Sequence, residues 1–133
     1  MLSFVEIAAL VGPVGVPRHR LEGWCDRGYI VPAEGGGSQG VHRRFTLMQS
    51  VGILVAARVF ASEQGCTPGF VGTVVAAFGA MTEADLMGQF AKGRTHLLTV
   101  CGGAPVLGSK QHPHQADVRQ AHRDVIAAML GKK

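Results

Sequence analysis

The sequence predicts a mainly helical protein that contains a small amount of β structure. Three observations lead to this fold class: apolar residues recur at helical spacing in several segments, helix-capping sequences precede most of these segments, and short β-branched runs lie beside glycine-rich stretches. Because 47% of the 133 residues are apolar, the chain can bury a sizeable core and global disorder is not expected.

Residues 4–11 are expected to form the first helix, because Ser3 and Glu6 have the spacing of a capping box. The Gly-Pro-Val-Gly stretch at residues 12–15 must end this helix, since glycine and proline both disfavour its continuation. The inward face of the helix is predicted to consist of its small and apolar residues: Phe4, Val5, Ile7, Ala8 and Ala9.

A second helix is predicted for residues 17–27, with Pro17 in the first turn, where its missing N–H is tolerated. Leu21, Trp24 and Cys25 share one face of this helix and can dock on the first one. The opposite face presents polar side chains, and Gly28 supplies a left-handed stop. The residues of that polar face are Arg18, Arg20 and Glu22.

A short β-hairpin is expected after the second helix. Residues 29–31 are predicted to form its first strand, residues 34–40 a glycine-rich loop, and residues 41–45 the return strand. Thr46 and Gln49 then have the spacing of another capping box, which predicts a long helix over residues 47–64. The apolar stripe of that helix consists of Val51, Leu54, Val55 and Val59.

The second half of the chain is predicted to contain three further helices and a hairpin. Thr67 and Thr82 can cap helices at residues 68–78 and 83–92. Residues 95–101 and 106–107 are expected to pair as a small hairpin, and residues 115–130 form an amphipathic helix. The apolar face of that last helix consists of Val118, Ala121, His122, Val125, Ile126 and Met129.

The order of these elements resembles the MerR-type winged helix-turn-helix DNA-binding domain over about residues 3–80, with relatives among phage excisionases and terminase small subunits. The likeness rests on residue spacing and on the His-Arg-Arg-Phe-Thr segment at 42–46, which resembles the wing-to-helix junction of the family. The matching positions before that segment are Gly15, Val16, Leu21, Trp24, Arg27, Gly28, Pro32 and Ala33. The resemblance implies a DNA-binding domain at residues 1–81 and a C-terminal segment at 82–133.

A recognition helix at residues 17–27 is expected to enter the major groove of duplex DNA, where arginine reads guanine through paired donors. A wing at residues 33–45 is expected to contact the backbone or the minor groove, and its two arginines have no acidic neighbour nearby in sequence. The candidate DNA-binding residues are Arg18, His19, Arg20, Arg27, His42, Arg43 and Arg44. Two features depart from the family: Glu22 stands where an arginine is usual, and the turn at residues 12–15 is longer.

The leading hypothesis is a small dimeric transcriptional regulator that binds double-stranded DNA and dimerises through residues 93–133. One alternative keeps the fold but assigns it to a phage or mobile element, as an excisionase or a terminase small subunit. Another is a protein–protein adaptor that has lost DNA binding. Glu22 supports the adaptor, as does the balance of five Lys/Arg against four Asp/Glu in residues 1–50.

Other classes of function are not expected. The net charge of +4 permits nucleic-acid binding, and no segment has the length and composition of a membrane span or a signal peptide, so a cytoplasmic location is expected. Three widely spaced cysteines form neither a disulfide framework nor a zinc motif, so no metal or cofactor is predicted. A nucleophile built from Cys101 and His96 lacks an orienting third group, so the chain is predicted not to be an enzyme.

Overall fold

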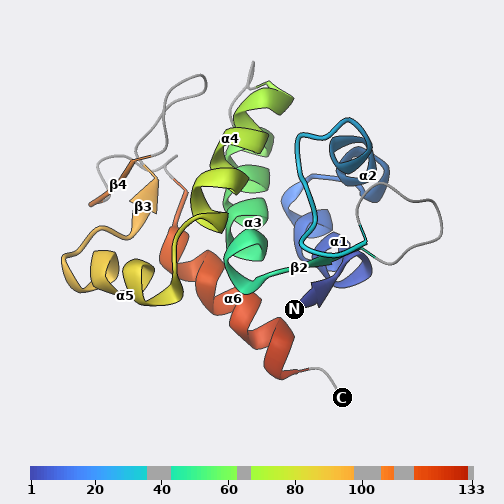
Figure 1. Ribbon diagram of the computed structural model, residues 1–133. Helices are drawn as coiled ribbons and strands as arrows, with labels where there is room; N and C mark the ends of the chain where they lie inside the picture. The colour runs from blue at the N-terminus through green and yellow to red at the C-terminus, as the bar shows by residue number, and fades with distance from the viewer. Residues whose placement is uncertain (36–42, 63–66, 98–105, 110–115, 132–133) are drawn as a thin grey trace.

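The computed structural model describes residues 1–35, 43–62, 67–97, 106–109 and 116–131. These residues form mainly α-helices with two small antiparallel strand pairs (Figure 1), which confirms the predicted fold class at this level. The helices are α1 (Phe4–Val11), α2 (Arg18–Asp26), α3 (Leu47–Ser62), α4 (Pro68–Gly79), α5 (Glu83–Ala91) and α6 (Val118–Leu130), with a short 3-10 helix η1 (Gly12–Val14) after α1.

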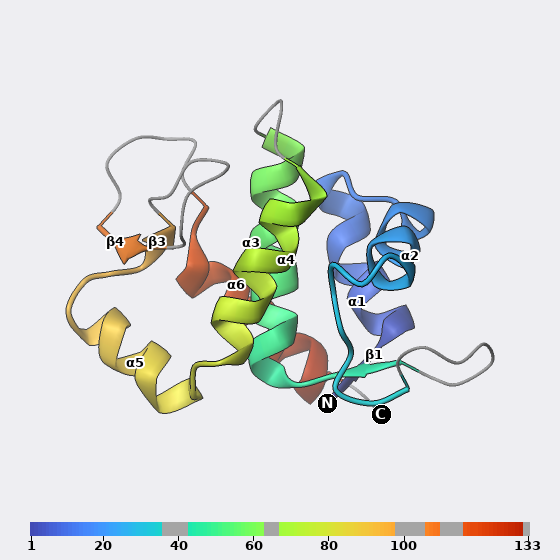
Figure 2. The same cartoon turned by 45° about the horizontal axis from the view of Figure 1, so that its top comes forward.

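The helices α3 and α4 pack against each other and separate two lateral parts of the molecule (Figures 1 and 2). On one side lie α1 and α2, and on the other side lie α5 and the strands β3 and β4. Helix α6 packs on α3 and also reaches α1. Val51, Leu54, Val55 and Val59 of α3 are all buried, as the predicted apolar stripe requires.

Side-chain caps explain why the helices begin where the sequence predicts them. Ser3 and Glu6 form a reciprocal capping box at α1, and Thr46 and Gln49 do the same at α3. The capping side chains of three other helices each accept a hydrogen bond from a backbone N–H in the first turn, and at α5 the Asp85 carboxylate also accepts from the Thr82 N–H. These caps are Thr67 at α4, Thr82 at α5 and Asp117 at α6.

The strand predicted at residues 29–31 is wrong. The backbone N–H groups of Tyr29 and Ile30 both donate to the carbonyl of Trp24, at 3.0 and 3.3 Å, so they close the end of α2. Gly28, at φ +81°, makes this reversal possible, as predicted. The segment is therefore a helix terminus rather than a strand of a ladder.

The first strand pair uses the extreme N-terminus instead. Strand β1 (Leu2–Ser3) pairs antiparallel with β2 (Arg44–Phe45), which is the described part of the predicted return strand. Glu34 forms a bridge with Arg44 on the other edge of β2. Three short segments therefore lie side by side at this position, and the side chains of Leu2 in β1 and Phe45 in β2 are fully buried.

The predicted inward face of α1 is only partly correct. Ile7 and Val11 are the fully buried residues of this helix, whereas Val5 is 59% exposed and Ala9 is exposed. Ile7 and Val11 are four residues apart and bury more apolar area together than Val5 and Ala9, the competing pair at the same spacing. The pairing of β1 with β2 also fixes the rotation of α1, because the helix follows β1 directly.

The predicted C-terminal hairpin is confirmed for the described residues, where β3 (His96–Leu97) pairs with β4 (Leu107–Gly108). Strand β3 also bonds to the chain before α6: the Leu97 N–H donates to the Ala116 carbonyl at 3.0 Å. Helix α6 begins at Val118, and the predicted start at residue 115 lies outside the described residues.

One hydrophobic cluster joins both predicted parts of the chain. Val118, Ala121 and Val125 of α6 lie in the same buried cluster as the core residues of α1, α3 and α4. The predicted boundary at residues 81 and 82 coincides with the start of α5. Among the described helices, none is by itself long and apolar enough to span a membrane; only α4 and α5 together reach that length, with a 95° bend.

Candidate nucleic-acid interface

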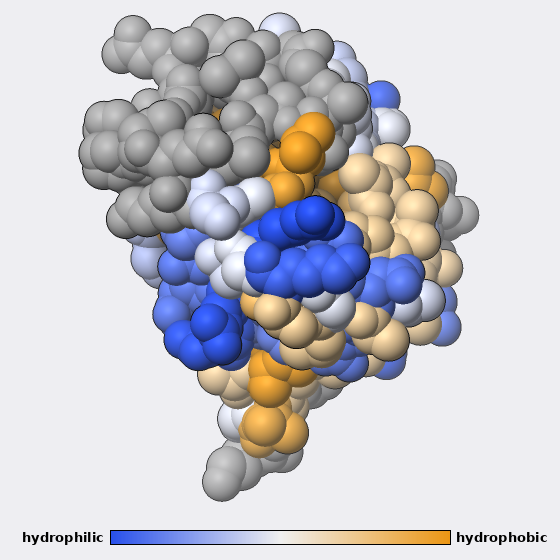
Figure 3. Space-filling view, turned by 90° about the vertical axis from the view of Figure 1, so that its left-hand side faces the viewer, coloured by the Kyte–Doolittle hydropathy of each residue, from blue (hydrophilic) through white to orange (hydrophobic). Residues whose placement is uncertain are grey.

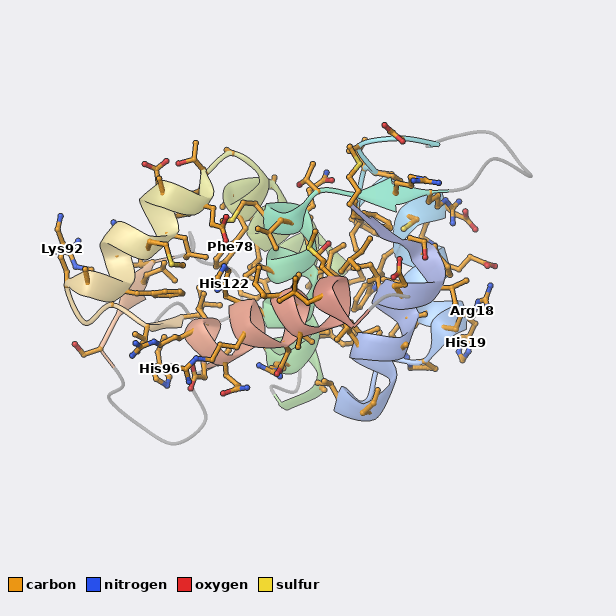
Figure 4. The ribbon with its side chains drawn as sticks, turned by 90° about the horizontal axis from the view of Figure 1, so that it is seen from below. Arg18, His19, Phe78, Lys92, His96 and His122 are labelled. Carbon is orange, nitrogen blue, oxygen red and sulfur yellow. The ribbon has the colours of Figure 1, made fainter. Side chains whose placement is uncertain are left out.

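Helix α2 divides its residues between the core and the surface as an exposed recognition helix requires. Leu21 and Trp24 are 0% and 1% exposed, so they fix the helix on the body of the protein. Arg18, His19 and Arg20 are exposed, and Figure 4 shows the first two at the outer edge of the molecule. The first turn of α2 therefore presents three basic or polar side chains to the surroundings.

Two arginines from different elements lie over one aromatic ring. The guanidinium carbon of Arg18, at the start of α2, is 5.5 Å from the centre of the Phe4 ring. That of Arg43, just before β2, is 5.8 Å from the same centre. Both distances are within the range of cation–π attraction, which contributes about 0.5–1 kcal/mol at an exposed site.

A third arginine is held in a similar way on the other side of α2. The guanidinium carbon of Arg20 lies 5.2 Å from the centre of the Phe60 ring, on α3. Phe60 in turn contacts Trp24 edge to face, with ring centres 5.1 Å apart and an angle of 78° between the planes. Trp24, which anchors α2, and Phe60, whose ring lies beneath Arg20, thus form one aromatic pair.

Arg43 has an acidic neighbour in space, although none lies near it in the sequence. Its guanidinium forms an ion pair with the carboxylate of Asp26, near the end of α2. The two residues are 17 positions apart, so only the fold brings them together. The Asp26 side chain is 58% exposed, which leaves this pair open to solvent and to competing anions.

The remaining predicted site residues do not all lie in the described part of the chain. Arg44 is exposed in β2, and its backbone bonds to Glu34 in both directions, at 2.9 and 3.2 Å. Arg27 is exposed and forms the C-cap of α2. His42 and the glycine-rich loop after Gly35 lie outside the described residues.

Cys25 lies beneath this surface, on the inner side of α2. Burial raises the pKa of its thiol from 9.0 to about 11, and the neighbouring Asp26 and Glu22 act in the same direction. The positive charge of Arg43 lowers the pKa of the thiol, but by less than burial raises it. Cys25 is therefore a protonated thiol at neutral pH and not a nucleophile.

Sequence reasoning missed the residues that hold the arginines in place. The sequence predicts Phe4 in the inward face of the first helix, and nothing in its spacing pairs Phe60 with Arg20 or Asp26 with Arg43. Phe4 is half-buried and directly follows the capping Ser3, so the position of its ring depends on where β1 and α1 join. Partners so distant along the chain leave no periodic signal.

Two histidines in the described part of the second half of the chain, His96 and His122, contact carboxylates of other segments. Nε2 of His122, on α6, lies 2.9 Å from a carboxylate oxygen of Glu83, on α5. Nε2 of His96 lies 3.7 Å from a carboxylate oxygen of Asp117 (both histidines are labelled in Figure 4). Among the described residues, no three histidines, cysteines or carboxylates come together in a way that could hold a metal ion.

A groove of about 770 Å³ lies between residues 28–33, the start of α3 and α4. At Gly72, α4 approaches the chain of residues 28–33 so closely that a Cβ there would lie 2.7 Å from the carbonyl oxygen of Tyr29. Its described lining contains no charged side chain, so the groove differs in character from the arginine-bearing surface of α2.

Helix α2 and the chain at β2 thus carry four arginines, of which Arg18 and Arg43 share the Phe4 ring and all but Arg43 are exposed: Arg18, Arg20, Arg43 and Arg44. No protein family model, curated protein or solved structure matches this chain. The argument for its function therefore depends on the chemistry of this surface.

Proposed function

We propose that the protein binds double-stranded DNA as a winged helix-turn-helix module, with α2 in the major groove and the segment 33–45 as the wing. One observation carries the proposal. The helix that exposes Arg18, His19 and Arg20 is anchored by buried Leu21 and Trp24. Its last residue, Asp26, pairs with Arg43, which directly precedes the strand that exposes Arg44. An anchored helix with outward arginines next to a basic strand fits both a groove and a phosphate backbone.

The arginines have different roles in this proposal. Arg18 and Arg20 stand in the first turn of α2, where a side chain of a recognition helix can reach a base edge and donate two hydrogen bonds to guanine. Arg43 and Arg44 stand at the base of the wing and contact phosphates. The Asp26 carboxylate partly neutralises Arg43 in the free protein and is displaced by the phosphate.

The proposed module acts as a homodimer that regulates transcription, with two half-sites about one helical turn, ~34–36 Å, apart. The dimer interface is assigned to residues 93–133. Because Val118, Ala121 and Val125 belong to the core of the protomer, the interface must use other residues of this segment. Leu130, which is 79% exposed, is the first candidate.

A protein–protein adaptor is the second candidate function, and two carboxylates favour it. Glu22 is exposed on the same helix as the arginines, and Asp26 pairs with Arg43. Both lower the positive potential that a phosphate backbone requires. An adaptor would use the same helix to bind a protein of mixed charge.

Selection of bound duplexes from a random DNA library tests the proposal and separates it from the adaptor. An enriched inverted repeat is expected, and its spacing reports the geometry of the dimer. Wild-type affinity for the selected duplex should fall with salt, and Arg44→Ala should reduce the slope of log K against log [salt] by about 0.9 per lost contact.

Lys92→Ala, at the exposed C-cap of α5 and outside the segment assigned to the dimer interface, is the matched control and should leave that slope unchanged. Absence of any salt-sensitive duplex binding by the wild-type protein rejects the proposal and favours the adaptor.

A further inference from the structure

Phe4 lies where the two basic elements of the proposed interface meet. Its ring is under the guanidiniums of both Arg18 and Arg43, at 5.5 and 5.8 Å. Its backbone N–H also donates to the carbonyl of Arg43 at 3.0 Å. Phe4 therefore fixes Arg43 through the main chain and through the side chain.

The neighbouring contacts strengthen this arrangement. Ser3 pairs with Arg44 in the antiparallel ladder, so the chain beside Phe4 is held in register with β2. The Asp26 carboxylate holds the Arg43 guanidinium near the C-terminal end of α2. Arg18 stands at the first residue of the same helix.

We propose that Phe4 is a positioning residue that holds Arg18 of the recognition helix and Arg43 of the wing together, so that Arg18 reaches a base edge and Arg43 a phosphate in the same stretch of DNA. The inference rests on the proposed DNA-binding function and adds to it the element that coordinates helix and wing. A long arginine side chain loses conformational freedom on binding, and this loss lowers affinity. The ring reduces that loss for both side chains before DNA arrives.

A positioning residue has a signature that a phosphate contact does not have. In Phe4→Leu both arginines are still present and Arg43 still neutralises its phosphate in the complex, so the salt slope is unchanged while affinity falls about tenfold. Arg43→Ala loses affinity and also lowers the slope, by about 0.9 for one contact. The two variants therefore differ in the salt dependence of binding.

The experiment measures duplex affinity at several salt concentrations for wild type, Phe4→Leu, Phe4→Tyr and Arg43→Ala, using the duplex enriched by selection. Phe4→Tyr keeps the ring and should bind within about twofold of wild type. Thermal unfolding of each variant shows that the assay temperature lies below the transition.

A Phe4→Leu variant that binds as tightly as wild type overturns the inference and leaves the proposed function standing. A Phe4→Tyr variant as weak as Phe4→Leu also overturns it, because the ring is then not the cause. If the wild-type protein shows no salt-sensitive duplex binding, the proposed function fails and this inference fails with it.

Discussion

Two sides of the molecule, the α1–α2 side and the side formed by α6 and the elements it contacts, use their charged side chains in different ways. On the α1–α2 side, the guanidiniums of Arg18, Arg20 and Arg43 lie over aromatic rings. Around α6, charged or polar side chains pair with carboxylates of other elements, as Arg58 does with Asp124 and His122 with Glu83. A ring face attracts a cation without using its N–H donors, whereas a carboxylate accepts from them.

This difference indicates which charges are available to a ligand. The arginines of the first side can still donate hydrogen bonds to an external anion. The ion pairs of the second side link helices of the protein to one another, so their donors are already used. Among the described residues, the face of the molecule that carries α5, β3 and β4 presents hydrophilic side chains interrupted by apolar ones (Figure 3). Arg43 belongs to both classes, because it lies over Phe4 and also pairs with Asp26.

The largest effect is expected where the two sides share a core. Val125 of α6 is fully buried in the cluster that includes α1 and α3, so Val125→Ala should lower the free energy of unfolding by about 2–3 kcal/mol. Because the core is shared, urea denaturation should remain a single transition followed by either Trp24 fluorescence or circular dichroism. Two separate transitions would show that α6 unfolds independently.

The next effect concerns the Cys25 thiol, on the inner side of α2. Because burial raises the Cys25 pKa from 9.0 to about 11, its thiolate is about a hundredfold scarcer in the folded protein below pH 9. Alkylation of Cys25 by iodoacetamide, followed by peptide mass spectrometry, should be slower by at least that factor than in urea. The folded state holds the proton more tightly, so this thiol contributes stability below pH 9 that is lost as the pH rises toward 11. Equal rates in both states would show that the Cys25 thiol is not buried in the folded protein.

A pair of glycines tests how tightly the α2 side is joined to α4. Gly72→Ala would place its Cβ 2.7 Å from the Tyr29 carbonyl oxygen, so it should lower stability by about 2 kcal/mol. Gly88→Ala in α5 meets nothing within 4 Å and should raise stability by up to about 1 kcal/mol. Thermal denaturation measures both, and a stable Gly72→Ala variant would mean that residues 28–33 move easily away from α4.

The smallest effect separates the two classes of arginine most directly. Arg58→Ala removes the pair with Asp124 and should lower stability by about 1 kcal/mol while leaving duplex affinity unchanged. Arg20→Ala removes an exposed group over Phe60 and should change stability by about 0.5 kcal/mol or less while altering sequence preference. Denaturation and duplex binding of both variants provide the comparison, and similar profiles would remove the distinction.

The helices could be predicted from the sequence because their signals are local. Ser3, Thr46, Thr67 and Thr82 each cap the helix that follows, and capping depends on residues only a few positions apart. The exposed arginines of α2 were predictable for the same reason, since Leu21 and Trp24 fix the opposite face. The winged helix itself stays a proposal.

The sequence did not predict contacts that join distant segments. The pairing of β1 with β2 replaces the hairpin expected from residues 29–31, because the Trp24 carbonyl takes the hydrogen bonds of Tyr29 and Ile30. The same limit applies to Asp26 beside Arg43 and to Phe4 beneath two arginines. Such contacts depend on how the helices are oriented after folding, which no short pattern encodes.

The burial of α3 has a consequence for how this sequence can change over time. Residues 51–57 are buried without interruption, and a Cβ at Gly52 would lie 2.9 Å from Phe78, so both larger and smaller side chains are disfavoured along this helix. The outer faces of α2 and α5 have no such restriction. Distant relatives should therefore share the small apolar residues of α3 while the exposed side chains of α2 and α5 diverge, and a search seeded on α3 and α4 should find them first.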